Sequence, residues 1–267
     1  MQRPSLLAAA LTAISCTILS ACSKNHDFCD PSQQEQNFCP IVSLESIDPA
    51  NPGITTAHYI IDYNETGNPL DILHFAGVYY PEFDYHFRYD QSHRLTDKIL
   101  NITGYNTAMN WDRYSYPAKN IIWDSVFNYG NSGITDPRPE AGSYSLTWIY
   151  TLDKEGRIIK AQVAGSPDYT IYQYDARGNL IRSGVTYDNK INPYQTNAVW
   201  KLIFKDYSVD NPSLGVSGFP SDVLEYNFIG LPVLMQGVTG GGGGINLFDH
   251  IFYTQLKLTY ACNTGQK

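Results

Sequence analysis

Positively charged residues are scarce in this chain. Its 267 residues include 18 Lys and Arg against 26 Asp and Glu, which gives a formal net charge of −8 at pH 7. Affinity for nucleic acid comes mainly from Lys and Arg side chains that displace counterions from the phosphate backbone. We therefore exclude nucleic acid as a partner.

Apolar runs long enough to cross a membrane as a helix are also missing. The uncharged run at residues 6–19 follows Arg3 and has 14 residues, whereas a membrane-spanning helix needs about 20. A short apolar segment behind a basic residue is typical of a signal peptide. We assign residues 1–21 to a signal peptide, the polar residues 22–38 to a flexible stalk, and residues 39–267 to one folded domain.

The end of the predicted signal peptide reads Leu19-Ser20-Ala21-Cys22. This junction resembles the lipobox of bacterial lipoproteins, in which the peptidase cuts before a cysteine that carries a diacylglyceryl group. The resemblance implies that Cys22 is lipidated and that several acyl chains anchor the protein, because one chain gives only marginal membrane binding. By analogy, Ser23 indicates transfer to the outer membrane. An ordinary cleaved signal peptide and an uncleaved anchor are the alternatives.

Cysteine is sparse, with five residues in the chain. One lies in the predicted signal peptide and Cys22 is the predicted lipid site, which leaves Cys29, Cys39 and Cys262. Export implies an oxidising compartment, where disulfides persist. Cys39 opens the first apolar run and Cys262 closes the last alternating run. We predict a Cys39–Cys262 disulfide, which would close a loop of more than 200 residues and stabilise the fold by roughly 4–5 kcal/mol. The alternative is a Cys29–Cys39 bond.

Motifs that carry catalysis are missing as well. The chain has no His-Glu-x-x-His, Gly-x-Ser-x-Gly or Ser-x-x-Lys, and the five glycines at 240–244 are not followed by the Lys and Ser or Thr of a phosphate-binding loop. No pair of carboxylates is indicated for glycoside hydrolysis. We predict no enzyme activity, no cofactor and no metal site. Five of the six histidines are scattered at His58, His74, His86, His93 and His250.

Aromatic residues, in contrast, are plentiful, with 21 Tyr, 11 Phe and 4 Trp. Many belong to a pattern that occurs five times: alternating apolar residues, then Asp or Asn, then Gly or His three residues later. The Asp or Asn can accept bonds from backbone N–H groups, and the residue three later often takes a positive φ. The pattern predicts a tight turn. The corner residues are Asn64 and Gly67, Asp90 and His93, Asp153 and Gly156, Asp175 and Gly178, and Asn227 and Gly230.

The residues before each corner have the period of a strand. In the first copy, Tyr63, Ile61 and Tyr59 alternate with other residues, which places one face of a strand against a core. Each copy is therefore predicted to be a strand, a turn and a second strand. The apolar run 199–204 is also interpreted as a short strand. No segment after residue 21 keeps a helical period over three turns, so we predict an all-β fold.

The fourth copy, residues 172–180, resembles the YD repeat of Rhs-type proteins, and residues 150–158 form a weaker copy. Over most of residues 19–262, the chain is similar to uncharacterised Bacteroidota-type lipoproteins with a lipobox, a polar stalk, YD-like hairpins and a final Tyr-x-Cys strand. This resemblance implies a single curled antiparallel sheet and no particular activity. The corners lie 26, 63, 22 and 52 residues apart, and this irregular spacing argues against a regular spiral cage.

These features predict a non-enzymatic lipoprotein of the cell envelope, anchored in the outer membrane, whose sheet is a scaffold or docking surface for a protein or glycan. The alternatives are a carbohydrate-binding surface lipoprotein and an unrecognised hydrolase. Trp111 lies in a loop-like Asn-Trp-Asp setting and is the predicted exposed ring on which a ligand would stack. A row of exposed aromatic residues would favour a glycan, and paired buried carboxylates would favour a hydrolase.

Overall fold

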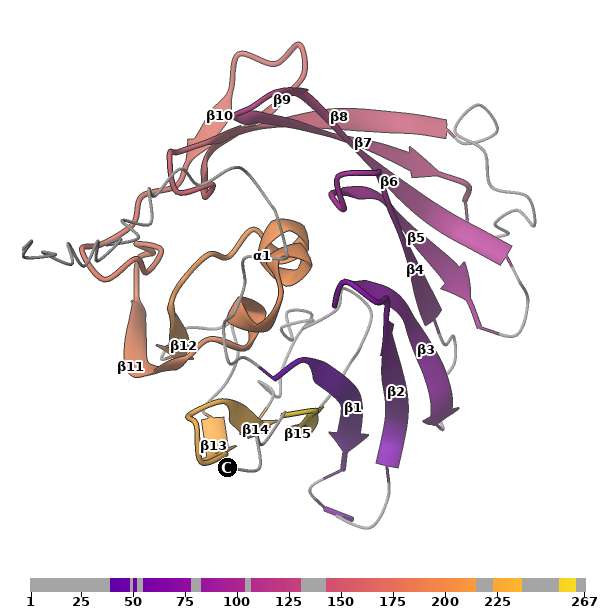
Figure 1. Cartoon of the computed structure of the whole chain (residues 1–267), viewed down its shortest axis with the longest axis vertical. Coiled ribbons are helices and arrows are strands. Elements are labelled where there is room, and N and C mark those ends of the chain that lie inside the picture. The colour runs from indigo at the N-terminus through magenta and orange to yellow at the C-terminus, as the bar shows by residue number, and fades with distance from the viewer. Residues whose placement is uncertain are drawn as a thin grey trace, which may run out of the picture.

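The computed structural model describes residues 39–48, 50–51, 55–77, 83–103, 107–130, 143–214, 223–236 and 255–262. These residues form one antiparallel sheet of 13 strands and a second sheet of two strands. The predicted all-β fold is confirmed. The large sheet is not closed, and it bends into an arc around a short helix (Figure 1). The signal peptide, Cys22, Cys29, the stalk and the glycines at 240–244 lie outside the described residues.

Strands β1 to β10 follow one another both in the chain and across the large sheet. They are β1 (Ile41–Ile47), β2 (Thr55–Tyr63), β3 (Pro69–Gly77), β4 (Phe83–Tyr89), β5 (Leu95–Ile102), β6 (Thr107–Ala118), β7 (Ile121–Asn128), β8 (Ser143–Leu152), β9 (Ile158–Val163) and β10 (Tyr169–Ile171). The remaining elements are β11 (Val185–Ile191), the 3-10 helix η3 (Pro193–Thr196), α1 (Ala198–Phe204), β12 (Asp210–Leu214), β13 (Val223–Tyr226), β14 (Pro232–Gln236) and β15 (Gln255–Tyr260).

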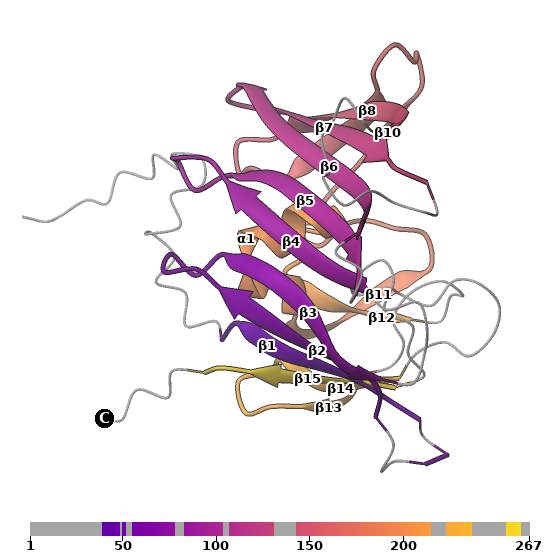
Figure 2. The same ribbon diagram turned by 90° about the vertical axis from the view of Figure 1, so that its right-hand side faces the viewer.

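The last part of the chain returns to the first. Strand β15 pairs with β1, and β14 and β13 extend the sheet beyond it, so that β10 and β13 are the two end strands (Figure 2). A disulfide joins Cys39, just before β1, to Cys262, just after β15, across a sequence separation of 223 residues. The predicted Cys39–Cys262 pairing is therefore confirmed over its alternative with Cys29.

All five predicted corners form the same turn. In the first, Asn64 Oδ1 accepts hydrogen bonds from the N–H groups of Thr66 at 3.0 Å and Asn68 at 2.9 Å. The third residue after the corner has a positive φ, 78° at Gly67 and 58° at His93, a region that glycine enters freely and histidine tolerates. The corners confirmed in this way are Asn64 and Gly67, Asp90 and His93, Asp153 and Gly156, Asp175 and Gly178, and Asn227 and Gly230.

Half-buried tyrosines connect several hairpins to their neighbours. The hydroxyl of Tyr89, one residue before a corner, donates to the carbonyl of Pro69, the residue that follows the preceding turn, at 2.5 Å. Burial raises the pKa of the Tyr89 phenol, so this group stays protonated and able to donate near neutral pH. Similar bonds run from Tyr63 to Ile41, from Tyr116 to Leu95, from Tyr174 to Ile158 and from Tyr260 to Pro232.

Two arginines stabilise the corner turns at the ends of the strands. Arg94 bonds to Asp90 at the second corner, with 2.7 Å between Nη2 and Oδ2, and its guanidinium lies 4.4 Å from the ring centroid of Tyr116. Arg157 repeats the arrangement at the third corner, where its guanidinium lies 4.3 Å from the ring of Tyr174. Each arginine thus joins its own turn to a tyrosine of a later hairpin.

The fourth copy departs from the prediction of two strands. Beyond β10, only an isolated bridge between Tyr174 and Leu180 remains. Polar groups that would pair within a hairpin bond instead to the segment around β12. Asn179 exchanges two hydrogen bonds with Asp210, and the Leu180 N–H donates to Ser208 Oγ at 3.0 Å. The second half of this hairpin therefore leaves the large sheet and packs against the segment around β12.

The predicted strand at 199–204 is wrong, because these residues form helix α1. Asn197 caps the helix by accepting a bond from the Val199 N–H at 2.8 Å, which satisfies one of the free donors of the first turn. A short apolar run does not distinguish a buried helix from a buried strand by periodicity. The cap was the available signal for a helix.

Candidate functional site

The concave face of the curled sheet is filled by an insert, defined here as residues 185–214 with β11, η3, α1 and β12 (Figure 1). Trp200 of α1 is 0% exposed and meets Phe87 of β4 edge to face, with ring centroids 5.9 Å apart. Asn197 Nδ2 donates to the carbonyl of Gly67 at 2.8 Å, which fixes the start of α1 to the first turn. The concave face is thus covered by the chain's own side chains.

Polar side chains bridge the opening of the sheet. Beyond β10, Arg177 Nη2 lies 2.7 Å from Asp210 Oδ2 of the insert. On the other side, the Tyr226 hydroxyl of β13 donates to Asp188, which also accepts a bond from Asn211 Nδ2 at 3.1 Å. The two end strands are therefore joined through the insert, mainly by side chains and not by strand pairing.

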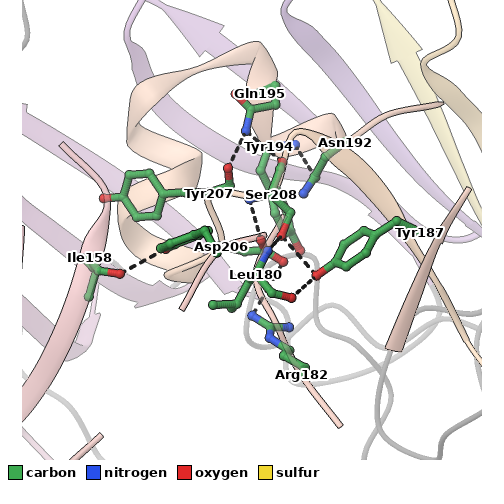
Figure 3. Close-up of polar contacts among 11 residues, drawn as sticks. Ile158, Leu180, Arg182, Tyr187, Asn192, Tyr194, Gln195, Asp206, Tyr207 and Ser208 are labelled. Carbon is green, nitrogen blue, oxygen red and sulfur yellow. Dashed lines mark hydrogen bonds and ion pairs between the residues drawn. The ribbon is translucent and has the colours of Figure 1, made fainter. Parts of the chain in front are cut away.

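A buried polar network holds the insert against the fourth hairpin (Figure 3). Ser208 is fully buried, and its Oγ contacts the Leu180 N–H at 3.0 Å and the Tyr187 hydroxyl at 3.3 Å. Asp206 Oδ1 accepts a bond from the Ser208 N–H at 2.9 Å, and its Oδ2 lies 3.6 Å from Arg182. The partners of the Ser208 hydroxyl are an amide and a phenol, neither of which is a general base at neutral pH. We therefore interpret this network as structural: its hydrogen bonds hold the insert to the fourth hairpin.

The concave face also holds a cluster of charged residues on β5, β6 and β7. Asp112 pairs with Lys98 at 2.8 Å. Asp124 of β7 pairs with Tyr114 of β6, and Tyr114 is two residues from Asp112 on the same strand. Asp124 and Asp112 therefore lie on the same face of the sheet. Burial, followed by the nearby charge of Asp112, raises the pKa of Asp124 to about 6, against the opposing effects of Lys205 and Lys98. Sequence reasoning did not find this cluster, because its members come from different strands.

Asp124 is covered in this structure. It is 3% exposed, its Oδ2 accepts a bond from the Tyr150 hydroxyl at 3.0 Å, and its Oδ1 has no hydrogen-bond partner. Lys205, at the end of α1, lies over the ring of Tyr150 with its ammonium 5.4 Å from the centroid. A carboxylate enclosed by the insert in this way is not positioned to contact a substrate.

The prediction that Trp111 is exposed is wrong. Trp111 lies on β6 and is 3% exposed in a second, smaller core on the convex face with Ile99 and Ala108. Its indole N–H donates to Asp97 at 2.6 Å, and Arg113 lies 4.6 Å from its ring. The Asn-Trp-Asp segment is strand and not loop, so the ring packs against neighbouring strands and is not available for stacking on a ligand.

Other aromatic rings are exposed on the convex face, and two of them lie in one line across β7 to β10. Trp123 of β7 is 44% exposed and Tyr169 of β10 is 59% exposed. The strand register places Trp123 opposite Ile149, Ile149 opposite Gln162, and Gln162 opposite Tyr169. We call these four residues the Trp123 row. Sequence analysis missed it, although the alternation of Trp123 with the buried neighbours Ile122 and Asp124 was a usable signal for its outward orientation.

The histidines of the described residues are not grouped at one site, and His250 lies outside those residues. His86 Nδ1 lies 2.6 Å from Asp71 Oδ1, and His58 Nε2 lies 3.0 Å from Ser43 Oγ. Within the described ranges, no three His, Cys, Asp or Glu side chains are grouped as a metal site requires. Those ranges also contain no helix with the length and hydrophobicity to cross a bilayer.

Comparisons with known proteins add little to this geometry. No protein-family model and no curated protein matches the chain. Two solved structures, titled "Crystal Structure of TcdB2-TccC3-Cdc42" and "Crystal Structure of TcdB2-TccC3-TEV", show a weak similarity to it and contain Rhs/YD-repeat chains. The first has a TM-score of 0.22 and 14% identity, over 53% of this chain and 8% of that one. The second has a TM-score of 0.22 and 17% identity, over 75% and 11%.

Proposed function

We propose that the chain is a non-enzymatic lipoprotein of the cell envelope, similar to Bacteroidota-type lipoproteins, anchored through Cys22 at the outer membrane and offering its sheet as a docking surface. The filling of the concave face by the insert carries this proposal. With that face covered, the convex face is the broad surface left for a partner. Exposed rings at Trp123, Tyr169 and Phe75 supply apolar contact area there.

The position of the acidic residues supports a role without catalysis. Asp112 and Asp124 are two neighbouring carboxylates on the concave face, and a hydrolase uses such a pair. Asp112 is engaged by Lys98, and Asp124 is enclosed between the sheet and the end of α1. Both carboxylates interact with other side chains inside the fold, where a polymeric substrate does not reach.

The lipid anchor is tested in cells that produce the full chain. We expect labelled palmitate to enter the wild-type protein, and Cys22→Ala to abolish the label and move the protein from the membrane fraction to the soluble fraction, because a single thiol receives the diacylglyceryl group. Cys29→Ala is the matched control and is expected to behave as wild type. A Cys22→Ala protein that stays in the outer membrane would contradict the anchor.

The docking surface is tested by photo-crosslinking in the same cells. A crosslinking residue at position 123 or 75, both on the convex face, is expected to give a discrete adduct. The same residue at position 170, which is exposed on the opposite face of β10, is expected to give none. Equal crosslinking at all three positions, or none at any, would show that the convex face is not a specific docking surface.

A carbohydrate-binding lipoprotein is the second candidate function. The observation in its favour is that the rings of Trp123 and Tyr169 share one row of the convex face.

A further inference from the structure

On the basis of the proposed docking function, we propose that the Trp123 row binds an uncharged, β-linked polysaccharide chain that lies across β7, β8, β9 and β10. Trp123 would stack on one sugar ring and Tyr169 on another, with Ile149 and Gln162 beneath the units between them. The ligand class follows from the spacing of the two rings, from the side chains between them and from the charge of the surface.

The spacing fits an extended chain. Trp123 and Tyr169 belong to strands separated by two others, and the register places them in one line perpendicular to the strands. Three strand spacings of about 4.8 Å separate the two positions by roughly 14 Å. Both rings point away from the core, because Trp123 alternates with the buried Ile122 and Asp124. An extended sugar chain can contact both rings only if it spans this distance without coiling.

The side chains in and beside the row suit sugar hydroxyls. Gln162 contributes an amide in the row; its Nε2 donates to the Ser166 carbonyl at 2.5 Å, so its Oε1 is the atom that would accept a bond from a sugar hydroxyl. The neighbouring row of the same face contains Thr151 and Lys160. The Lys160 ammonium lies 4.4 Å from the ring centroid of Tyr169, so this cation orients a ring of the row. Aromatic faces with a few hydrogen-bonding groups between them give rigid contact at a low entropy cost.

The charge of the surface selects a neutral ligand. The four residues of the Trp123 row are uncharged, and the cation beside them, Lys160, lies against the ring of Tyr169. The chain as a whole has a net charge of −8, which disfavours polyanions. A protein partner fits less well, because protein interfaces concentrate their energy in a contiguous, fully desolvated centre. Here the two exposed rings are separated by the half-buried Ile149 and Gln162.

The experiment measures binding of the full-length acylated protein, in detergent, to insoluble cellulose, chitin, xylan and mannan. Starch granules serve as the α-linked comparison and alginate as the polyanion. We expect saturable binding to at least one of the four β-linked polymers, and at least tenfold weaker binding for Trp123→Ala and for Tyr169→Ala. Tyr169→Phe keeps the ring and is expected to retain binding. Phe75→Ala removes a 69% exposed ring of the same face outside the row and is the matched control.

Each outcome decides the proposal. Binding to none of the four β-linked polymers overturns it, as does binding to alginate alone or binding that survives both alanine substitutions. Loss of binding in Phe75→Ala as well would show a general apolar effect and would also overturn it. A protein adduct at position 123 without polysaccharide binding would reject the glycan while leaving the docking function in place.

Discussion

Among single residues, Asp124 lies in an environment that disfavours its charged form. Its carboxylate is buried, one of its oxygens has no hydrogen-bond partner, and Asp112 adds a second negative charge on the same face. Removing a carboxylate from water disfavours its charged form, so the folded state holds the proton more tightly than the unfolded state does. The pKa of Asp124 is accordingly raised from its ordinary value of 3.8 to about 6.

The raised pKa predicts a specific pH dependence of stability. Because the folded pKa lies above the unfolded one, the contribution of Asp124 to stability is complete below about pH 4 and is lost as the pH rises through 6. The shift corresponds to about 3 kcal/mol. We expect Asp124→Asn, which cannot ionise, to raise the free energy of unfolding at pH 7.5 and to flatten its decline between pH 4 and pH 6.5, as measured by urea denaturation.

The control for this prediction is Asp175→Asn. The corner turn accepts Asn at the equivalent positions Asn64 and Asn227, and backbone hydrogen bonding from Asn179 lowers the pKa of Asp175 instead of raising it. The Asp175→Asn protein should therefore keep the wild-type decline between pH 4 and pH 6.5. An Asp124→Asn protein with unchanged stability and an unchanged slope would refute the assignment.

The burial of Trp111 and the exposure of Trp123 could not both be predicted from the residues next to them in the sequence. Trp111 and Trp123 both lie next to an Asp in the sequence, yet Trp111 is buried and Trp123 is exposed. Tertiary contacts account for the difference in exposure. Ile99 of β5 packs against the ring of Trp111, and Asp97 of β5 accepts the hydrogen bond from its indole N–H. Neither neighbour is close to Trp111 in the sequence, so the local setting misled the prediction.

At the scale of elements, the hairpins were predictable because their turns are local. Each corner is built from five consecutive residues whose backbone groups bond to one side chain, as at Asp153, which accepts bonds from the N–H groups of Glu155 and Arg157. Helix α1 was not predictable from its apolar residues alone. Its buried residues Val199, Trp200 and Leu202 lie in a short apolar run, which does not distinguish a helix from a strand by periodicity. Its place inside the arc depends on Asn197 reaching a turn 130 residues away in the sequence.

The tyrosine bonds between hairpins give a prediction at this scale. Tyr89→Phe removes the hydroxyl that donates to the Pro69 carbonyl and leaves the ring in place. We expect the free energy of unfolding to fall by about 0.5–1.5 kcal/mol, the usual net contribution of one such bond. Urea denaturation is the measurement. Tyr169→Phe is the control, because its ring is 59% exposed, and it should leave stability unchanged. An equal effect in both variants would show that the hydroxyl bond does not connect the hairpins.

For the whole molecule, the decisive contact is between the two ends of the described chain. Most neighbouring strands are joined by short turns, but β15 pairs with β1, and the end strand β13 is attached through β14 and β15. Bringing such distant segments together carries a large loop-closure entropy. The sequence indicated this contact through its cysteines, whereas the strand order beyond β15 had no local signal.

The Cys39–Cys262 disulfide offsets that entropy, and its removal is the test. We expect the double substitution Cys39→Ser, Cys262→Ser to lower the free energy of unfolding by about 2–5 kcal/mol, because the cross-link restricts the unfolded chain. The strands β13 to β15 should lose amide protection in hydrogen exchange before β4 to β8 do. Cys29→Ser should change neither quantity. A reductant that leaves the unfolding midpoint of the wild-type protein unchanged, or peptide mapping that joins Cys29 to Cys39, would contradict the role of this bond in holding the ends of the sheet together.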